Sequence, residues 1–211
     1  MNQIDKNTEE KIVDAAYKVF LDKGFDGTRM QHIADEAQIN KSLLHYYFRT
    51  KEKLFEMVFN KVIDIFLPET TKILNSNQTL FEVIETFCYE YISFLHKNPF
   101  IPAFIINEIN KNKNKIPAFF GEMFKKVKES NLKNFNRLVE KEIQEKKIKF
   151  IEPNTLIINI LSLCIFPFVA SPIISKFFFE DNKTEFAKFI ENRKKEVAEF
   201  VIKSIKIEQN D

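Results

Sequence analysis

The stretch INKSLLHYYFRTKEKL, from Ile39 to Leu54, combines a histidine, two tyrosines, a phenylalanine and several basic side chains. Because residues three and four apart share one face of an α-helix, Leu44 and Phe48 predict a common inward face. The polar and aromatic side chains between them then point outward. Asn40 is a good N-cap, so we expect a helix to begin there with the positive end of its dipole exposed. Such a helix fits a polyanion.

A second short helix is expected directly upstream. TRMQHIADEA carries apolar residues at helical spacing, and Thr28 with Gln31 gives the Thr-x-x-Gln pattern of a capping box. Before it, TEEKIVDAAYKVFLDKGF has an apolar stripe, and Gly24 stands where a helix should stop. Three short helices, the last two close together, are typical of a helix-turn-helix, whose second member enters the major groove. The part of the opening stretch from Ile39 to Phe48 is therefore predicted to be a recognition helix.

These residues resemble the TetR family of one-component bacterial transcriptional repressors. The resemblance lies in GFDGTRMQHIADEAQINKSLLHYYFRTKEKLF, from Gly24 to Phe55, and beyond it is architectural only. The matching positions are Gly24, Phe25, Thr28, Ile33, Ala34, Ala37, Asn40, Tyr47, Phe48, Lys51, Glu52, Lys53 and Leu54. The sequence departs at Ser42 and at Gln38, where the family usually has glycine, and at His45, which replaces a frequent tyrosine. A left-handed turn costs a non-glycine residue free energy.

Composition favours an all-α chain in two parts. Its 211 residues suffice for one small and one larger domain, and only three glycines and seven prolines occur, without strand alternation. We expect a helix-turn-helix DNA-binding domain at 1–50 and a larger helical ligand-binding and dimerisation domain at 51–211. The net charge of +2 is too small for non-specific coating of nucleic acid. DNA binding must therefore depend on local placement of charge.

The resemblance implies that a homodimer reads a palindromic operator in double-stranded DNA, with recognition helices about 34 Å apart. The candidate DNA contacts are Thr28, Arg29, Gln31, Lys41, Ser42, Leu43, His45, Tyr46, Tyr47 and Lys51. Residues of the recognition helix are expected to face base edges, whereas Thr28, Tyr47 and Lys51 match positions that the family uses to clamp phosphates. A ligand that changes the helix spacing would release the DNA.

The middle of the chain is rich in phenylalanine. Helices are expected at 51–74, capped by Thr50, and at 79–97, 99–110 and 117–147. Core packing is the simpler interpretation of most of these aromatic residues, but the resemblance implies an inducer cavity here. Interior positions with a polar tip and neighbouring rings are the candidates: Phe87, Cys88, Tyr91, His96, Phe104, Asn107, Glu108 and Phe124. A mostly apolar pocket favours a small apolar or aromatic inducer.

The segment PNTLIINILSLCIFPFVASPIIS, residues 153–175, contains no charged residue. About twenty apolar residues can span a bilayer, but polar residues and two prolines interrupt this run, so we expect no membrane span. A helix that is apolar nearly all round is buried by its own domain and a partner. The resemblance implies that segments 154–175 and 184–206 form a four-helix homodimer interface. Within the first segment we expect Leu161, Ile165 and Phe168 to face the partner subunit.

Other chemistry finds little support. His32, Asp35 and Glu36 lack a further cluster for a metal site, no phosphate-binding glycine motif occurs, and no cofactor is implied. Without a signal peptide or a Cys-x-x-Cys pair, we expect a cytoplasmic protein with reduced, buried thiols. Two alternatives remain open: a helical protein-binding adaptor without sequence-specific DNA binding, and an enzyme that uses His96 or Glu108 in the phenylalanine-lined cavity.

Overall fold

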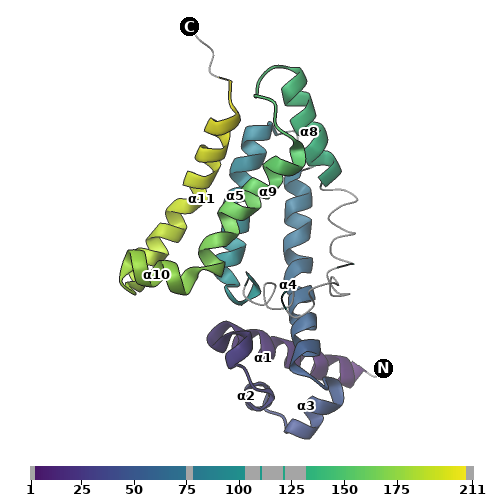
Figure 1. The fold of residues 1–211 in the computed structure, drawn as a ribbon. Coiled ribbons are helices and arrows are strands. Elements are labelled where there is room, and N and C mark those ends of the chain that lie inside the picture. The colour runs from purple at the N-terminus through teal and green to yellow at the C-terminus, as the bar shows by residue number, and fades with distance from the viewer. Residues whose placement is uncertain (1–2, 75–77, 103–109, 111–120, 122–131, 208–211) are drawn as a thin grey trace.

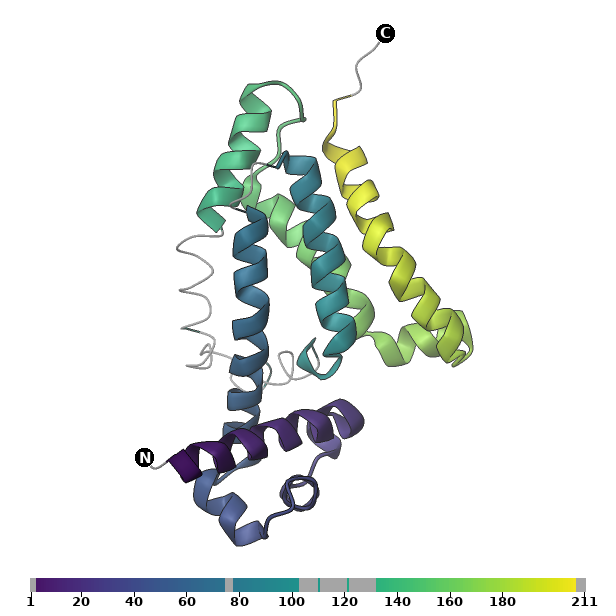
Figure 2. The same ribbon diagram turned by 180° about the vertical axis from the view of Figure 1, so that it is seen from behind.

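A computed structural model describes residues 3–74, 78–102, 110, 121 and 132–207, and within these ranges the chain is built from α-helices without a named strand (Figure 1). The predicted DNA-binding part lies at one end of the molecule and the C-terminus at the other (Figures 1 and 2). The prediction of an all-α fold, with a helix-turn-helix followed by a larger helical part, is confirmed.

The first three helices form a small bundle with its own hydrophobic core. They are α1 (Gln3–Gly27), α2 (Met30–Glu36) and α3 (Lys41–Tyr47). Gly24 interrupts α1 at φ 66° and ψ 176°, a conformation open to glycine but strained for other residues, so the predicted stop is confirmed. The rings of Phe20, Phe25 and Phe55 pack together in this first core, with centroids 5.0–5.9 Å apart.

A long helix, α4 (Lys51–Leu74), rises from this bundle into the rest of the molecule (Figures 1 and 2). Thr50 caps it as predicted, because its hydroxyl accepts a hydrogen bond from the Lys53 N–H at 3.2 Å. Its first turns bury Leu54, Phe55 and Phe59 in the first core. One rigid element therefore contributes to the DNA-binding bundle and extends beyond it.

The second core is formed by the later helices. These are α5 (Leu80–Lys97), α8 (Lys133–Gln144), α9 (Pro153–Val169) and α11 (Lys183–Ile205), with a short α10 (Ser171–Phe179) before the last. Predicted helices 51–74, 79–97 and 184–206 agree with α4, α5 and α11 to within a residue. Most of the predicted helix 99–110 and the start of the predicted helix 117–147 lie outside the described residues. The α8 helix lies within the predicted helix 117–147.

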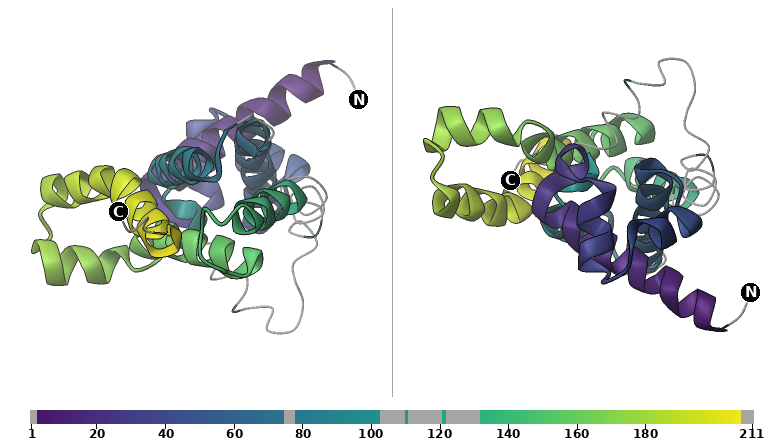
Figure 3. Two further views of the ribbon diagram at one scale, coloured as in Figure 1. Left: turned by 90° about the horizontal axis from the view of Figure 1, so that it is seen from above. Right: turned by 90° about the horizontal axis from the view of Figure 1, so that it is seen from below.

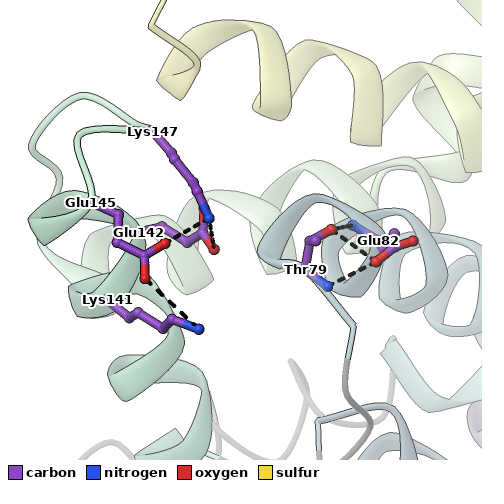
Figure 4. Close-up of polar contacts among 6 residues, drawn as sticks. All are labelled: Thr79, Glu82, Lys141, Glu142, Glu145 and Lys147. Atoms are coloured by element: carbon purple, nitrogen blue, oxygen red, sulfur yellow. Dashed lines mark hydrogen bonds and ion pairs between the residues drawn. The ribbon is translucent and has the colours of Figure 1, made fainter.

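Short-range polar contacts fix two helix ends (Figure 4). At the start of α5, the Thr79 N–H donates to the Glu82 carboxylate at 2.8 Å, and the Glu82 N–H donates to the Thr79 hydroxyl at 3.3 Å. This capping box holds the pKa of Glu82 below its usual value. After α8, the Lys147 ammonium lies 2.6 Å from Glu145 and 3.7 Å from the buried Glu142. These contacts hold the turn after α8 against the last residues of that helix.

Residues 154–175 do not form one helix, so that expectation is wrong. The helix breaks at Ala170, and α10 turns by 74° from α9. Pro172 stands at the start of α10. Proline is tolerated there because the first N–H groups of a helix have no partner within the helix. Figure 3 shows α10 and the start of α11 projecting from one side of the molecule. No single described helix is long and apolar enough to cross a membrane; α9 and α10 pass that test only as a bent pair.

Inside α9, Pro167 leaves one backbone carbonyl without its normal partner. Proline has no N–H, so the carbonyl of Leu163, four residues earlier, loses its helical hydrogen bond. The guanidinium of Arg193 in α11 donates to this carbonyl at 2.9 Å instead. A side chain of the neighbouring helix thus replaces the missing backbone donor and fixes α9 to α11.

Candidate nucleic-acid interface

The α3 helix presents one polar face to solvent because its other face is anchored. Leu44 is fully buried and Phe48 is buried, both in the first core. The Asn40 side chain accepts a hydrogen bond from the Leu43 N–H at 2.7 Å, so the predicted N-cap is confirmed. The predicted base-reading residues are all exposed on this helix: Lys41, Ser42, Leu43, His45 and Tyr46. The structure therefore brings these five together on one accessible helix.

The turn between α2 and α3 adopts a Schellman geometry. Gln38 has φ +54°, its N–H donates to the Asp35 carbonyl at 3.1 Å, and the Ile39 N–H donates to the Ala34 carbonyl at 3.0 Å. A left-handed residue at this place is usually glycine, because a side chain strains that backbone. Gln38 therefore adopts, at a cost in stability, a conformation that glycine adopts without strain.

Thr28 has a different role from the one its sequence pattern predicts. Its hydroxyl is buried and donates to the Gly24 carbonyl at 2.6 Å. The α2 helix begins after Arg29, whose N–H donates to His32 Nδ1 at 3.3 Å, while Gln31 bonds Asp35 at 2.7 Å. The predicted capping box of Thr28 and Gln31 is therefore wrong. A buried hydroxyl cannot clamp a phosphate unless this turn opens, so Thr28 closes the α1 end instead.

Lys51 also contacts the protein itself. Its ammonium donates to the carbonyl oxygens of Phe25 at 2.7 Å and Thr28 at 3.1 Å, and lies 4.3 Å from the Phe25 ring centroid. Two of its three N–H donors are therefore used within the turn. This role does not follow from the sequence, since a matching motif position does not indicate where a flexible side chain points.

The remaining predicted DNA contacts surround α3. Arg29 and Gln31 are exposed at the start of α2, and Tyr47 is half-buried with its ring 5.3 Å from that of Tyr46 at 89°. Arg49 is exposed just after the helix. The positive N-terminal end of a helix, flat rings and flexible cations together suit a groove with phosphates on both sides.

Only part of the predicted inducer site is described. On α5, Phe87 stacks on Tyr91 at 5.5 Å, and Cys88 is fully buried. A hydrogen bond with the Cys88 thiol, together with burial, raises the pKa of Cys164 on α9, and burial raises the pKa of Tyr91. His96 is exposed in the last turn of α5, so the expectation that it faces the interior is wrong. Phe104, Asn107, Glu108 and Phe124 lie outside the described residues.

The end of α5 inserts into the DNA-binding bundle. The Tyr17 hydroxyl donates to Asn98 Oδ1 at 3.1 Å, and the Asn98 amide donates to the Phe94 carbonyl at 2.8 Å. Phe100 is buried in the first core, with its ring 5.7 Å from that of Phe55. Sequence reasoning missed this link; its signal is the Asn-Pro-Phe triplet that ends the predicted helix at 79–97.

A helix-turn-helix with an exposed second helix, joined by one long helix to a larger helical part, defines a DNA-binding regulator. Among the described residues no group of three or more His, Cys, Asp or Glu side chains could hold a metal ion. Residues 12–58 match the family model described as "Bacterial regulatory proteins, tetR family".

The chain is similar to known regulators over most of its length. It is 23% identical over 172 residues to the probable HTH-type transcriptional regulator YttP of Bacillus subtilis, covering 81% of each chain. It is 24% identical over 143 residues to IcaR of Staphylococcus aureus, a negative transcriptional regulator of the biofilm operon icaADBC, covering 67% of this chain and 72% of IcaR. The structure of FadR from B. subtilis with stearoyl-CoA matches with a TM-score of 0.62 at 16% identity, over 92% and 97% of the chains.

Residues 12–58 are thus a DNA-binding domain of the TetR family, and the resemblance drawn from residues 24–55 is confirmed. That family consists of transcriptional regulators rather than enzymes. The structural similarity, at this identity, concerns the fold.

Proposed function

We propose that the protein is a repressor that binds a palindromic operator as a homodimer and leaves it when a small apolar or aromatic ligand binds. The observation that carries this proposal is the α3 surface, where Leu44 and Phe48 anchor a helix whose Lys41, His45 and Tyr46 remain exposed. The description of IcaR as a negative regulator supports repression. We assign base reading to the exposed α3 side chains and phosphate contact to Arg29, Tyr47 and Arg49.

The dimer is proposed to form through α9 and α11. Their outward faces expose Ile158 (58%), Phe166 (62%) and Phe200 (66%), and large apolar side chains in this number mark an interaction surface. Leu161 and Ile165, expected to face the partner, are half-buried, and Phe168 is buried in the second core of its own protomer. The exposed face of α9 thus differs from the expected one, and Phe166 takes the place of Phe168 at the proposed interface.

The inducer is proposed to bind in the second helical part, near Phe87, Cys88 and Tyr91. These side chains offer stacked rings and few polar atoms, which favours an apolar or aromatic molecule. The binding of stearoyl-CoA by FadR supports an apolar ligand in this fold. We place the boundary between the two functional parts inside α4 rather than at residue 50, since Leu54, Phe55 and Phe59 complete the first core.

Selection of bound fragments from genomic DNA tests the proposal. The purified protein should enrich a palindrome whose half-sites are centred about one helical turn apart. The matched control is Leu43→Ala with Tyr46→Ala, which changes two exposed α3 side chains and should enrich no palindrome. Weak binding without sequence preference in the unaltered protein would contradict the proposal and favour the helical adaptor.

A further inference from the structure

A pocket of about 480 Å³ lies where α1, α4 and α5 meet, between the DNA-binding bundle and the second helical part. Tyr17 of α1, Val58 and Val62 of α4, and Phe94 of α5 supply its apolar walls. Phe87, Cys88, Tyr91 and His96 do not line it, so it differs from the proposed inducer site on α5. Its volume falls within the range of small-molecule sites.

The chemistry of this junction pocket favours an uncharged occupant. Asp14 and Lys61 form an ion pair with each other across α1 and α4. Glu90 and Lys97, both exposed on α5, add one charge of each sign. Because the acidic and basic groups balance, neither an anion nor a cation is strongly attracted. An apolar molecule that buries its surface on the walls gains the larger stabilisation.

One polar group in the wall can select among uncharged molecules. The Ser93 hydroxyl oxygen is buried and has no hydrogen-bond partner within the described part of the chain. An unpaired buried hydroxyl costs free energy. When rotation about χ1 turns the Ser93 Oγ toward the pocket, a bound molecule with its own hydroxyl can supply the missing partner. The pocket therefore suits a ring or short chain that carries a hydroxyl.

The walls belong to elements of both functional parts. Tyr17 on α1 reaches Asn98 at the end of α5 at 3.1 Å, and Asp14 on α1 reaches Lys61 on α4. A molecule lodged between them contacts both functional parts at once. If it fits one separation of α1 and α5 better than another, binding shifts the population toward that separation.

We propose that this junction pocket binds a small uncharged amphipathic molecule with a hydroxyl group, and that its occupancy changes DNA affinity by fixing α1 relative to α5. The change in DNA affinity rests on the proposed function, whereas the binding itself does not. The pocket is then a second effector site, distinct from the site proposed around Phe87 and Tyr91.

Methyl NMR of the full-length protein tests binding without DNA, with benzyl alcohol as the probe. The Val58 and Val62 methyl signals should shift saturably with a dissociation constant of about 1 mM, as expected for so small a ligand. Benzoate and benzylamine, which carry the same ring and a charge, should bind about ten-fold more weakly. Ser93→Leu narrows the pocket and removes the hydroxyl, so it should abolish the shifts. The control Thr86→Leu changes α5 where it faces α11 and should preserve them.

A second variant, Ser93→Ala, tests the site even if Ser93→Leu does not fold. Ser93→Ala keeps the space and removes the hydroxyl, so it should weaken benzyl alcohol about three-fold or more and leave toluene unchanged. Absence of saturable shifts at Val58 and Val62 in the unaltered protein would overturn the proposed site. Equal shifts in Ser93→Leu would overturn it as well.

The coupling is tested by operator affinity at saturating benzyl alcohol. We expect a change of about three-fold or more in the unaltered protein and none in Ser93→Leu. Saturable methyl shifts with unchanged operator affinity would overturn the coupling. A protein that binds no operator even without the probe would overturn the proposed function instead, and the NMR result would still decide the site.

Discussion

The Lys51 ammonium binds Phe25 in two ways: it donates to the Phe25 carbonyl oxygen at 2.7 Å and lies 4.3 Å from the centroid of the Phe25 ring. That ring packs against Phe20 and Phe55 in the first core. The first residue of α4 therefore holds the end of α1, and with it the start of α2, in place. We therefore expect DNA binding to depend on this turn as well as on direct phosphate contacts.

Lys51→Met should lower the free energy of unfolding by about 1–3 kcal/mol, because two carbonyls lose a charged donor. DNA affinity should fall for all sequences alike. Denaturant unfolding and DNA titrations at several salt concentrations measure both effects. The control Lys53→Met removes an exposed ammonium paired with Glu56 and should leave stability nearly unchanged. Unchanged stability in Lys51→Met, with a salt slope reduced by about one, would identify Lys51 as a phosphate contact alone.

Gln38→Gly should stabilise the protein by about 0.5–1 kcal/mol, since glycine adopts φ +54° without steric strain. Thermal or denaturant unfolding measures the change. Gln31→Gly is the matched control, because it places glycine inside α2 and should destabilise by about 1 kcal/mol. A destabilised Gln38→Gly protein would show that the Gln38 side chain contributes more than its backbone conformation costs.

Tyr46→Ala should preserve folding, because this side chain is 79% exposed. Affinity for the selected operator should fall by about 1–3 kcal/mol, as for a lost base contact, while affinity for random DNA changes little. Competition between labelled operator and random duplex measures the ratio. Leu44→Ala, the buried neighbour, should instead lose stability and all DNA binding together. Equal losses on both DNAs for Tyr46→Ala would remove it from base reading.

Phe166→Glu or Phe200→Glu should dissociate the proposed dimer, because association would bury an unpaired charge. Each variant should keep its helical circular dichroism, sediment as a monomer and bind the full operator little better than a half-site, since the linked second contact is lost. Phe150→Glu, also at an exposed phenylalanine, is the control and should remain dimeric. A dimeric Phe166→Glu protein would move the interface away from α9.

Arg193→Met should destabilise the protein by about 1–3 kcal/mol, because the Leu163 carbonyl loses its donor. Pro167→Ala restores a backbone N–H four residues after Leu163 and should recover much of that loss in the double variant. A double-mutant cycle from denaturant unfolding gives the coupling. Additive effects of the two substitutions would mean that Arg193 and the proline do not act on the same carbonyl.

Local signals predicted the helix-turn-helix well. The Asn40 cap, the Gly24 stop and the Leu44 anchor each depend on a few neighbouring residues, so each can be predicted from the local sequence. The break at Ala170 was missed because the segment 153–175 has no charged residue, and its two internal prolines do not by themselves show where a helix turns. Its direction goes with the packing of α10 against α11, where the Phe179 ring lies 5.1 Å from that of Phe189, a contact that periodicity does not encode.

The candidate site was predicted less completely. Exposure of Lys41, His45 and Tyr46 follows from helical phase, whereas the inward direction of Thr28 and Lys51 depends on carbonyls of a turn. The insertion of Phe100 into the first core is a contact between distant segments, which periodicity does not encode. The motif identified Thr28 and Lys51 as important positions, but their contacts with backbone carbonyls follow only from the folded turn.

The α4 helix acts as a lever. Its 24 residues span about 36 Å at 1.5 Å per residue. A rotation of only about 5° around its upper end would move its lower end by about 3 Å, by the geometry of a rod of that length. A small rotation of α4 among the upper helices is therefore enough to move α3. The length of α4 converts a small angle into a displacement comparable to the separation of neighbouring base pairs.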